Sequence, residues 1–225
     1  MKKTKKLTKT GCLGLLIVIE GTDGSGKTTQ LNLLKNWIEN QAYGVIVSEW
    51  KSSSLIAPVI DNAKEKNLFN ANTFSLMYAT DFTHRLENTI IPALEAGFVV
   101  LLDRYTYTAF ARDVVRGVKP KWVRKLYNFA PEPDLVFYLE QPVEVLLKRI
   151  IASRGLDYYE SGRDIGLSTD FYESFKIYQT KILEEYNKMK EKYNFITIDG
   201  TQSIEVIQDQ MQLEVKKLLD EGVLG

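Results

Sequence analysis

The chain has 225 residues, 44% of them hydrophobic, which is enough for one domain of ordinary size with a substantial core. Lysine plus arginine and aspartate plus glutamate number 29 each, and this balance argues against a nucleic-acid-binding protein, which would carry a basic excess. Cys12 is the only cysteine and His84 the only histidine, so the composition excludes a disulfide framework and a Cys/His metal site.

The N-terminal residues 1–10 carry five lysines ahead of an apolar run, an order that imitates a secretory signal. We reject that interpretation because residues 15–19 are needed as a strand, Glu20 ends the run, and no small-residue cleavage site follows it. We expect a flexible basic tail at residues 1–10 and a single domain at residues 11–225. No later stretch approaches the roughly 18 continuous apolar residues of a membrane span, so we expect a cytoplasmic protein without membrane contact.

Short apolar runs rich in branched residues predict five strands, at residues 15–19, 45–49, 98–102, 135–139 and 195–198. Between and after them, helical periodicity predicts helices over residues 28–40, 72–95, 142–151, 169–192 and 203–219. Strands that alternate with helices predict a parallel sheet covered on both faces. A ligand is then expected beyond the carboxyl ends of the strands.

Residues 21–28, G-T-D-G-S-G-K-T, match the phosphate-binding pattern G-x-x-x-x-G-K-[ST] at every fixed position. The loop glycines let backbone N–H groups turn toward one concavity, where the dipole of the following helix adds to the field. Lys27 is expected to reach the outer phosphates of a nucleotide. The hydroxyl of Thr28 is expected to ligate a magnesium ion that bridges those phosphates.

A second landmark, Asp103-Arg104-Tyr105, follows the strand expected at residues 98–102 directly. Asp103 could hold magnesium there, and Arg104 could clamp a phosphate in bidentate fashion. An ion pair at a strand end is the usual interpretation of such a dipeptide. Because the phosphate loop belongs to the same edge of the sheet, we favour a functional role.

A third region, residues 148–164, begins as a helix and passes into a loop that contains Arg149, Arg154 and Arg163 among glycines and aromatic residues. Such a composition suits a mobile lid, expected at about residues 152–168, that brings arginines to a transferred group. An ordinary solvated loop with scattered charges is the alternative.

With these landmarks the chain resembles the thymidylate kinases, nucleoside monophosphate kinases of the phosphate-loop class, over most of residues 13–200. The matching segments are E-G-T-D-G-S-G-K-T-T-Q at 20–30, I-P-A-L-E-A-G at 91–97, D-R-Y at 103–105, R-G at 116–117 and P-D-L at 133–135. The resemblance implies the three-layer α/β fold of P-loop NTPases, with a five-stranded parallel sheet in the order 2-3-1-4-5. It also implies a lid and a homodimer.

The same resemblance assigns Lys27 and Thr28 to ATP and magnesium, Asp23 to the acceptor's sugar hydroxyl, and Arg104 to the acceptor's phosphate. Family members carry a catalytic arginine in the phosphate loop or in the lid. Position 25 is a serine here, so Arg154 is the first lid candidate and Arg163 the second. The predicted catalytic residues are Lys27, Asp103, Arg104, Arg154 and Arg163, and the metal ligands are Thr28 and Asp103. The predicted nucleotide-binding residues are Gly21, Asp23, Gly24, Ser25, Gly26, Lys27, Thr28, Thr29 and Arg149.

The base-reading positions depart from the family pattern. Phe82 stands where an arginine is usual, Arg85 lies one turn farther on, and Arg112-Asp113 replaces the usual Tyr-Gln. As a carboxylate, Asp113 only accepts hydrogen bonds, so it favours a base that offers an amino or imino proton. A local ion pair between Arg112 and Asp113 on a helix surface is the alternative. The predicted substrate contacts are Asp23, Glu49, Phe82, Arg85, Arg104, Tyr105, Arg112 and Asp113.

The resulting hypothesis is a kinase that uses ATP and Mg²⁺ to phosphorylate a (deoxy)nucleoside monophosphate, with dTMP as the leading acceptor. Such a reaction needs positioning and positive charge rather than a strong base. Three alternatives stay open: a kinase for another monophosphate, a deoxynucleoside kinase with Glu49 as base, and a degenerate protein that binds ATP without turnover.

Overall fold

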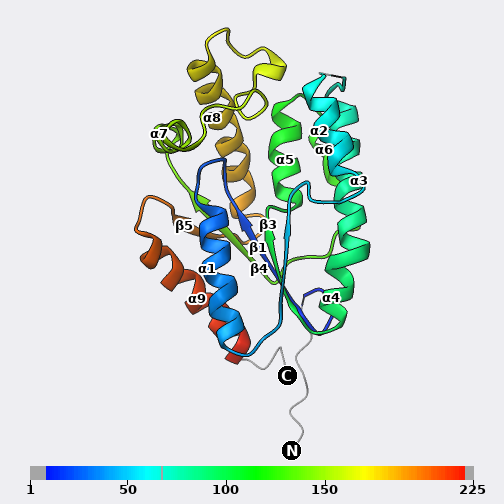
Figure 1. Ribbon diagram of the computed structural model, residues 1–225, viewed down its shortest axis with the longest axis vertical. Helices are drawn as coiled ribbons and strands as arrows, with labels where there is room; N and C mark the ends of the chain where they lie inside the picture. The colour runs from blue at the N-terminus through cyan, green and yellow to red at the C-terminus, as the bar shows by residue number, and fades with distance from the viewer. Residues whose placement is uncertain (1–8, 67, 221–225) are drawn as a thin grey trace, which may run out of the picture.

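Five parallel strands form the centre of the molecule, in the order β2-β3-β1-β4-β5 (Figure 1). The computed structural model describes residues 9–66 and 68–220. The strands are β1 (Leu15–Glu20), β2 (Val45–Glu49), β3 (Val99–Asp103), β4 (Leu135–Glu140) and β5 (Ile196–Asp199). The predicted strands and their order are therefore confirmed. Phe98 is the one residue of the predicted third strand that lies outside β3.

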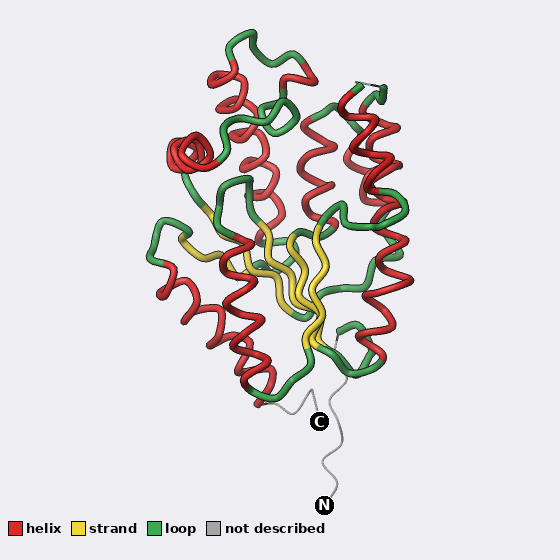
Figure 2. The backbone as a smooth tube through the Cα atoms, in the orientation of Figure 1, coloured by secondary structure: helices red, strands yellow, loops and turns green. Residues whose placement is uncertain are grey.

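Helices cover both faces of the sheet, as Figure 2 shows. On β1, Leu15, Ile17 and Ile19 face one core, which includes residues of α1 (Lys27–Asn40) and α9 (Ile204–Asp220). Leu16 and Val18 face the other core, which includes residues of α3 (Ala71–Arg85), α5 (Thr106–Val115) and α8 (Phe171–Lys190). All five side chains are fully buried, because a parallel sheet with two covered faces has no solvent side.

The helix expected over residues 72–95 is divided into three parts. After α3 comes a π-helical turn, Leu86–Ile90, and then the short α4, Ile91–Glu95. Pro92 offers no N–H to the carbonyl four residues earlier, and its ring would clash there in a regular helix. A wider π turn just before the proline fits this constraint. The helix expected at residues 142–151 is α7, Val143–Ser153.

Three helices were absent from the sequence-based prediction: α2 (Ala57–Glu65), α5 and α6 (Pro120–Leu126). Seven of the ten residues of α5 are buried, so its sequence lacks the polar face that reveals an amphipathic helix. α2 and α6 are short, and each has a proline in its first turn. Proline is tolerated there, but it weakens a helical pattern read from sequence.

The predicted basic tail lies outside the described residues except for Lys9 and Thr10. The backbone N–H of Lys9 donates a hydrogen bond of 2.8 Å to Asp134 Oδ1, just before β4. In the part of the chain that the structure describes, no helix has the length and apolar character needed to cross a membrane.

The register of the strands brings the predicted site residues to one edge. Glu49 of β2 and Ile19 of β1 both stand opposite Asp103 of β3. Each strand ends at this level, and the phosphate loop leaves β1 one residue later. The carboxyl edge of the sheet therefore gathers Glu49, Asp103 and the loop, as the parallel topology requires.

A buried ion pair connects α3 to the end of β2. Arg85 Nε lies 2.8 Å from Asp81 Oδ2, and Arg85 Nη1 donates to Ser48 Oγ at 3.0 Å. Asp81 Oδ1 accepts a hydrogen bond from the N–H of Ser53 at 2.9 Å. The Arg85 guanidinium also lies 5.7 Å from the centre of the Trp50 ring. Arg85 thus supports the segment that carries Trp50.

We expect Arg85→Met to lower the free energy of unfolding by about 3–5 kcal/mol, because the buried Asp81 carboxylate loses its countercharge. The double variant Asp81→Asn/Arg85→Met should recover part of that loss, since no buried charge remains. Urea unfolding of the two variants and the parent protein measures both effects. A loss below about 1 kcal/mol in the single variant would show that the pair is not buried as described.

Candidate active site

The loop between β1 and α1 forms a concave turn at the carboxyl edge of the sheet. Gly24 (φ 78°) and Gly26 (φ 90°) adopt left-handed backbone conformations that favour glycine. A Cβ on Gly24 would come 2.9 Å from Ile150 of α7, so close packing also requires glycine there. Because α1 begins at Lys27, directly after Gly26, the positive end of its dipole faces this turn. The loop is shaped and polarised to bind an anion.

Lys27 lies buried against the loop, with its Nζ donating a hydrogen bond of 2.8 Å to the carbonyl oxygen of Thr22. Burial and, to a lesser extent, the nearby Arg104 guanidinium lower the pKa of Lys27 to about 8, against the opposite effects of Asp103 and Asp23. A bound polyphosphate would favour the charged form again, because a close anion stabilises an ammonium group. The binding of phosphate and the protonation of Lys27 are therefore linked.

Thr28 and Asp103 lie together at the mouth of the loop, with Thr28 Oγ1 donating to Asp103 Oδ2 at 2.8 Å. A hydroxyl and a carboxylate are hard oxygen ligands of the kind that Mg²⁺ prefers. The described residues contain no cluster of three or more His, Cys, Asp or Glu side chains that could hold a metal ion. A magnesium ion bound by one or two protein oxygens, phosphates and water fits this arrangement.

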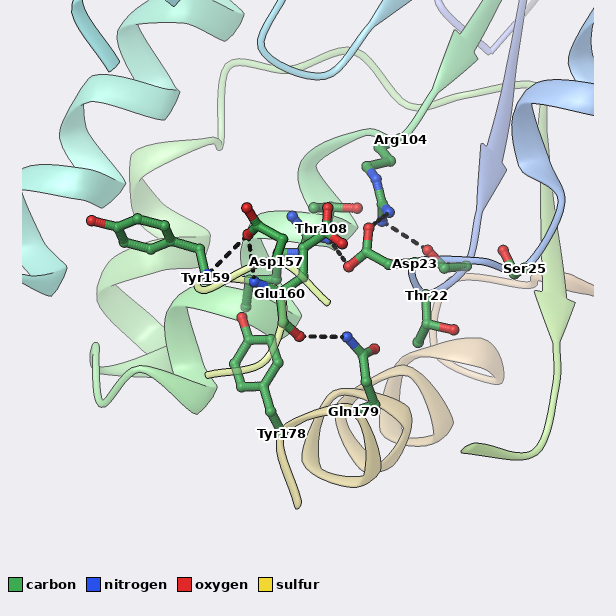
Figure 3. Close-up of polar contacts among 12 residues, drawn as sticks. Thr22, Asp23, Ser25, Arg104, Thr108, Asp157, Tyr159, Glu160, Tyr178 and Gln179 are labelled. Carbon is green, nitrogen blue, oxygen red and sulfur yellow. Dashed lines mark hydrogen bonds and ion pairs between the residues drawn. The ribbon is translucent and has the colours of Figure 1, made fainter. Parts of the chain in front are cut away.

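Asp23 holds two arginines from different parts of the chain, and Figure 3 shows one of them, Arg104, beside it. Arg104 Nη2 lies 2.6 Å from Asp23 Oδ1, and Arg112 Nη2 lies 2.5 Å from Asp23 Oδ2. Burial would raise the pKa of Asp23, but the Arg112 and Arg104 guanidinium groups hold it well below its usual range. Asp23 is therefore ionised, and it concentrates two positive charges beside the loop.

The backbone at Arg104 is left-handed, with φ 75°, a conformation uncommon for a residue other than glycine. Glu20 fixes the turn, because its Oε1 accepts a hydrogen bond of 2.8 Å from the N–H of Tyr105. Glu20 Oε2 lies within 2.8 Å of Thr108 Oγ1 and 2.7 Å of the Tyr186 hydroxyl. Burial of this carboxyl raises its pKa. Glu20 thus ties the end of β1 to the turn that directs Arg104 toward Asp23.

Two adjoining cavities open at this edge. The first is here called the phosphate cavity and the second the aromatic cavity. They share Trp50, and the pair of Asp23 and Arg112 joins them, because Asp23 lines the first and Arg112 the second. The phosphate cavity is lined by Asp23, Gly24, Gly26, Lys27, Thr28, Thr29, Glu49, Trp50, Asp103, Arg104 and Arg154. The aromatic cavity is lined by Trp50, Lys64, Phe74, Tyr78, Thr108, Ala109, Arg112, Asp113, Arg116, Tyr159 and Glu160.

Asp113 is a buried carboxyl group in the wall of the aromatic cavity. The Ser75 hydroxyl donates a hydrogen bond to its Oδ2, which joins α3 to α5. Burial raises the pKa of Asp113 to about 6, against the opposite effects of Ser75 and Arg116. The alternative of an Arg112–Asp113 ion pair on a helix surface is wrong, because Asp113 is buried and Arg112 pairs with Asp23. At neutral pH, Asp113 offers the cavity a hydrogen-bond acceptor.

The segment between α7 and α8 lies over the aromatic cavity. Arg116 of the loop after α5 donates to the Tyr159 carbonyl at 2.8 Å and to Asp164 Oδ2 at 2.7 Å. The Tyr159 hydroxyl donates to the Lys64 carbonyl of α2 at 2.8 Å. Gln179 of α8 donates to the Glu160 carbonyl at 2.9 Å, as Figure 3 shows. These contacts hold the segment expected to be a lid against both α2 and α8.

The predicted lid arginines occupy different places. Arg154 lines the phosphate cavity and pairs with Glu160 at 2.6 Å. Arg163, in the short 3₁₀ turn Arg163–Ile165, donates to the Ser168 carbonyl and lies 5.0 Å from the centre of the Phe171 ring. Arg149 of α7 donates to the Gly200 carbonyl at 3.2 Å, outside both cavities. The structure therefore brings Arg154, and not Arg163, to the phosphate cavity.

Three of the predicted substrate contacts lie outside both cavities. Phe82 and Tyr105 are 0% and 1% exposed and pack against each other in the core. Arg85 is held in the ion pair with Asp81. None of the three lines either cavity. Asp23, Glu49 and Arg104 do line the phosphate cavity, and Arg112 and Asp113 line the aromatic cavity.

Several residues of the aromatic cavity were not singled out from the sequence. Trp50, Lys64, Phe74 and Tyr78 lie on elements without a motif, and α2 itself was absent from the prediction. Tyr159 and Glu160 fell inside the predicted lid, so their region was found but their roles were not. The only available signal was the aromatic spacing of Phe74, Tyr78 and Phe82 along α3, which a core helix would also produce.

The fold and the site together define a nucleotide kinase with the P-loop NTPase architecture. A family model described as thymidylate kinase matches residues 19–211. The chain is 47% identical to a probable thymidylate kinase 2 of Saccharolobus solfataricus, over 93% of this chain and 97% of that protein. It is 30% identical to a probable thymidylate kinase of Thermococcus kodakarensis, over 92% and 100%, and 30% identical to a thymidylate kinase of Desulfotalea psychrophila, over 92% and 96%. The chain therefore belongs to the thymidylate kinase family.

The lowered pKa of Lys27 predicts that ATP binds less tightly as the pH rises above about 8. Free Lys27 loses its proton there, whereas bound phosphate keeps the ammonium form, so binding takes up a proton. Calorimetry in two buffers of different ionisation enthalpy should detect this uptake near pH 9 and its absence near pH 7. Lys27→Arg, which stays protonated, should abolish it. An ATP affinity at pH 9 equal to that at pH 7, without proton uptake, would contradict the assignment of Lys27 to the phosphates.

Proposed function

We propose that this enzyme transfers the γ-phosphoryl group of ATP to dTMP and produces ADP and dTDP. The bond between the γ-phosphorus and the bridging oxygen of ADP breaks, and a bond to a phosphate oxygen of dTMP forms. The observation that carries the proposal is the junction of the two cavities at Asp23, Arg104 and Arg112. Phosphates of donor and acceptor can meet there in one line, with the acceptor's base in the aromatic cavity.

The charges of the phosphate cavity suit this transfer. Lys27 and the loop N–H groups would hold the donor's phosphates, and Arg104 would hold the acceptor's phosphate. Arg154 lines the same cavity and would neutralise the charge on the transferred group. The acceptor is already an anion, so no strong base is required. When bound at Thr28 and Asp103, Mg²⁺ would supply further neutralisation of charge on the donor's phosphates.

The aromatic cavity suits a pyrimidine base. Tyr78 and Trp50 stack at 12° with ring centres 6.0 Å apart, and together with Phe74 they offer flat apolar walls. The carboxylate of Asp113 would accept the N3 proton of thymine. The edge of thymine presents acceptor, donor and acceptor in turn, and the cavity supplies cationic donors besides that carboxylate. Asp23 would contact the sugar between the two cavities.

Two further parts of the proposal do not rest on contacts in the structure. We propose a homodimer, the assembly that the resemblance implies. We also propose a cytoplasmic location, which agrees with nucleotide substrates. Sedimentation of the purified protein would test the first, and fractionation of cells would test the second.

A panel assay tests the proposed reaction directly. Each deoxynucleoside and ribonucleoside monophosphate, and thymidine itself, is offered with ATP and Mg²⁺, and the products are separated. We expect dTDP formation from dTMP to be the most efficient reaction. Turnover of thymidine but not of dTMP would refute the proposal in favour of a nucleoside kinase. ATP binding without turnover of any acceptor would refute it in favour of a degenerate kinase.

Arg104→Ala should lower kcat by roughly 100-fold or more, because a cationic donor at the transferred phosphate is lost. ATP affinity should change little, since Lys27 and the loop hold the donor. Arg104→Lys should recover only part of the rate, because an ammonium cannot bind in bidentate fashion. Steady-state kinetics and ATP titration of both variants provide the measurement. A loss of ATP affinity as large as the loss in kcat would indicate that Arg104 contacts ATP instead of the acceptor's phosphate.

A further inference from the structure

Lys64 extends from the last turn of α2 into the aromatic cavity. Its Nζ lies 5.1 Å from the centre of the Tyr159 ring and 5.7 Å from that of Tyr78. Among residues 9–66 and 68–220, no oxygen accepts a hydrogen bond from this ammonium and no carboxylate pairs with it. The other charged groups of the cavity do have polar partners: Arg112 has Asp23, Asp113 has Ser75, Arg116 has Asp164 and Glu160 has Arg154.

This ammonium group is partly buried and lies between two aromatic rings. It is a compact, strongly hydrated charge, and two ring faces replace only part of its hydration. Burial lowers the pKa of Lys64, Arg112 lowers it further, and Asp157 opposes the change. A ligand oxygen that accepts a hydrogen bond in the cavity would replace the missing solvation. Lys64 can therefore donate a hydrogen bond to a ligand oxygen in the cavity.

The surroundings of Lys64 indicate which kind of ligand oxygen would accept its hydrogen bond. In the proposed function, Arg104 holds the phosphate of the nucleotide that is phosphorylated, and Arg104 lines the phosphate cavity, which Lys64 does not line. Lys64 instead shares a cavity with the flat rings of Phe74 and Tyr78 and with Asp113. These neighbours suit a planar base, so the expected partner is a ring carbonyl oxygen.

We propose that Lys64 donates a hydrogen bond to the 4-carbonyl oxygen of the acceptor's pyrimidine and so selects thymine and uracil over cytosine. This inference rests on the proposed function and adds to it a residue that determines specificity. Lys64 reaches the cavity from α2, whereas Asp113 reaches it from α5. The two side chains thus belong to separate walls of one cavity.

The chemistry of the two bases explains the selection. Thymine presents a 4-carbonyl beside an N3 proton, which matches a donor at Lys64 and an acceptor at Asp113. Cytosine presents a 4-amino group beside an unprotonated N3. The ammonium would then face a donor, and the carboxylate would face a lone pair. Unpaired polar groups in a closed site discriminate more strongly than the loss of one bond does.

Lys64→Met tests the inference because it removes the ammonium while keeping a long unbranched side chain over the two rings. The measured quantities are kcat/KM for dTMP, for dCMP and for 4-thio-dTMP, whose sulfur is a weaker acceptor. We expect kcat/KM for dTMP to fall roughly 10- to 100-fold, the effect of losing one charged hydrogen bond. Activity with dCMP should not fall, and the parent enzyme's preference for dTMP over 4-thio-dTMP should disappear.

Two further variants distinguish a role of Lys64 in base specificity from a purely structural role. Lys66→Met removes an exposed lysine at the end of the same helix and should leave the preference for dTMP unchanged. Lys64→Arg keeps a donor and should retain most of the preference. An equal loss with all three acceptors in Lys64→Met, or an unchanged ratio of dTMP to dCMP, would overturn the inference. Failure of the parent enzyme to phosphorylate dTMP would instead overturn the proposed function.

Discussion

The site depends on one carboxylate, that of Asp23, which lies between the guanidinium groups of Arg104 and Arg112. Without it, two partly buried positive charges would face each other at the junction of the cavities, beside a third on Lys27. The arrangement fixes both arginines before substrate arrives, so little reorganisation remains for the reaction itself. It also places the phosphate loop and α5 at a defined spacing, because Asp23 belongs to the first and Arg112 to the second.

The rest of the fold supports this junction. Parallel register brings the ends of β1, β2 and β3 to one level, and Glu20 holds the left-handed turn at Arg104. The buried pair of Asp81 and Arg85 supports the segment that carries Trp50, the residue shared by both cavities. The segment between α7 and α8 then covers the aromatic cavity through Tyr159 and Arg116. The phosphate loop, the aromatic cavity and the segment that covers it therefore depend on separate contacts.

The sequence predicted the strands and the phosphate loop, because local signals specify them, whereas the strand order followed from the family resemblance. Five apolar runs mark the strands, and fixed spacing marks Lys27 and Thr28. The aromatic cavity could not be predicted in the same way, since its walls come from α2, α3, α5 and the lid, and only tertiary packing brings them together. Phe82 illustrates the difference: its position suggested a base contact, but the ring is fully buried in the core. Lys64 had no motif at all, and α2 lacked a recognisable pattern.

In the proposed reaction, one continuous path for phosphates joins the two cavities across Asp23, Arg104 and Arg112. A ligand in which adenosine and thymidine are joined through a chain of phosphates tests this path. Occupying both cavities at once, it should bind with one-to-one stoichiometry and roughly 100-fold more tightly than ATP or dTMP alone, as measured by calorimetry. Affinity no greater than that of ATP, with dTMP still able to bind beside it, would contradict the claim.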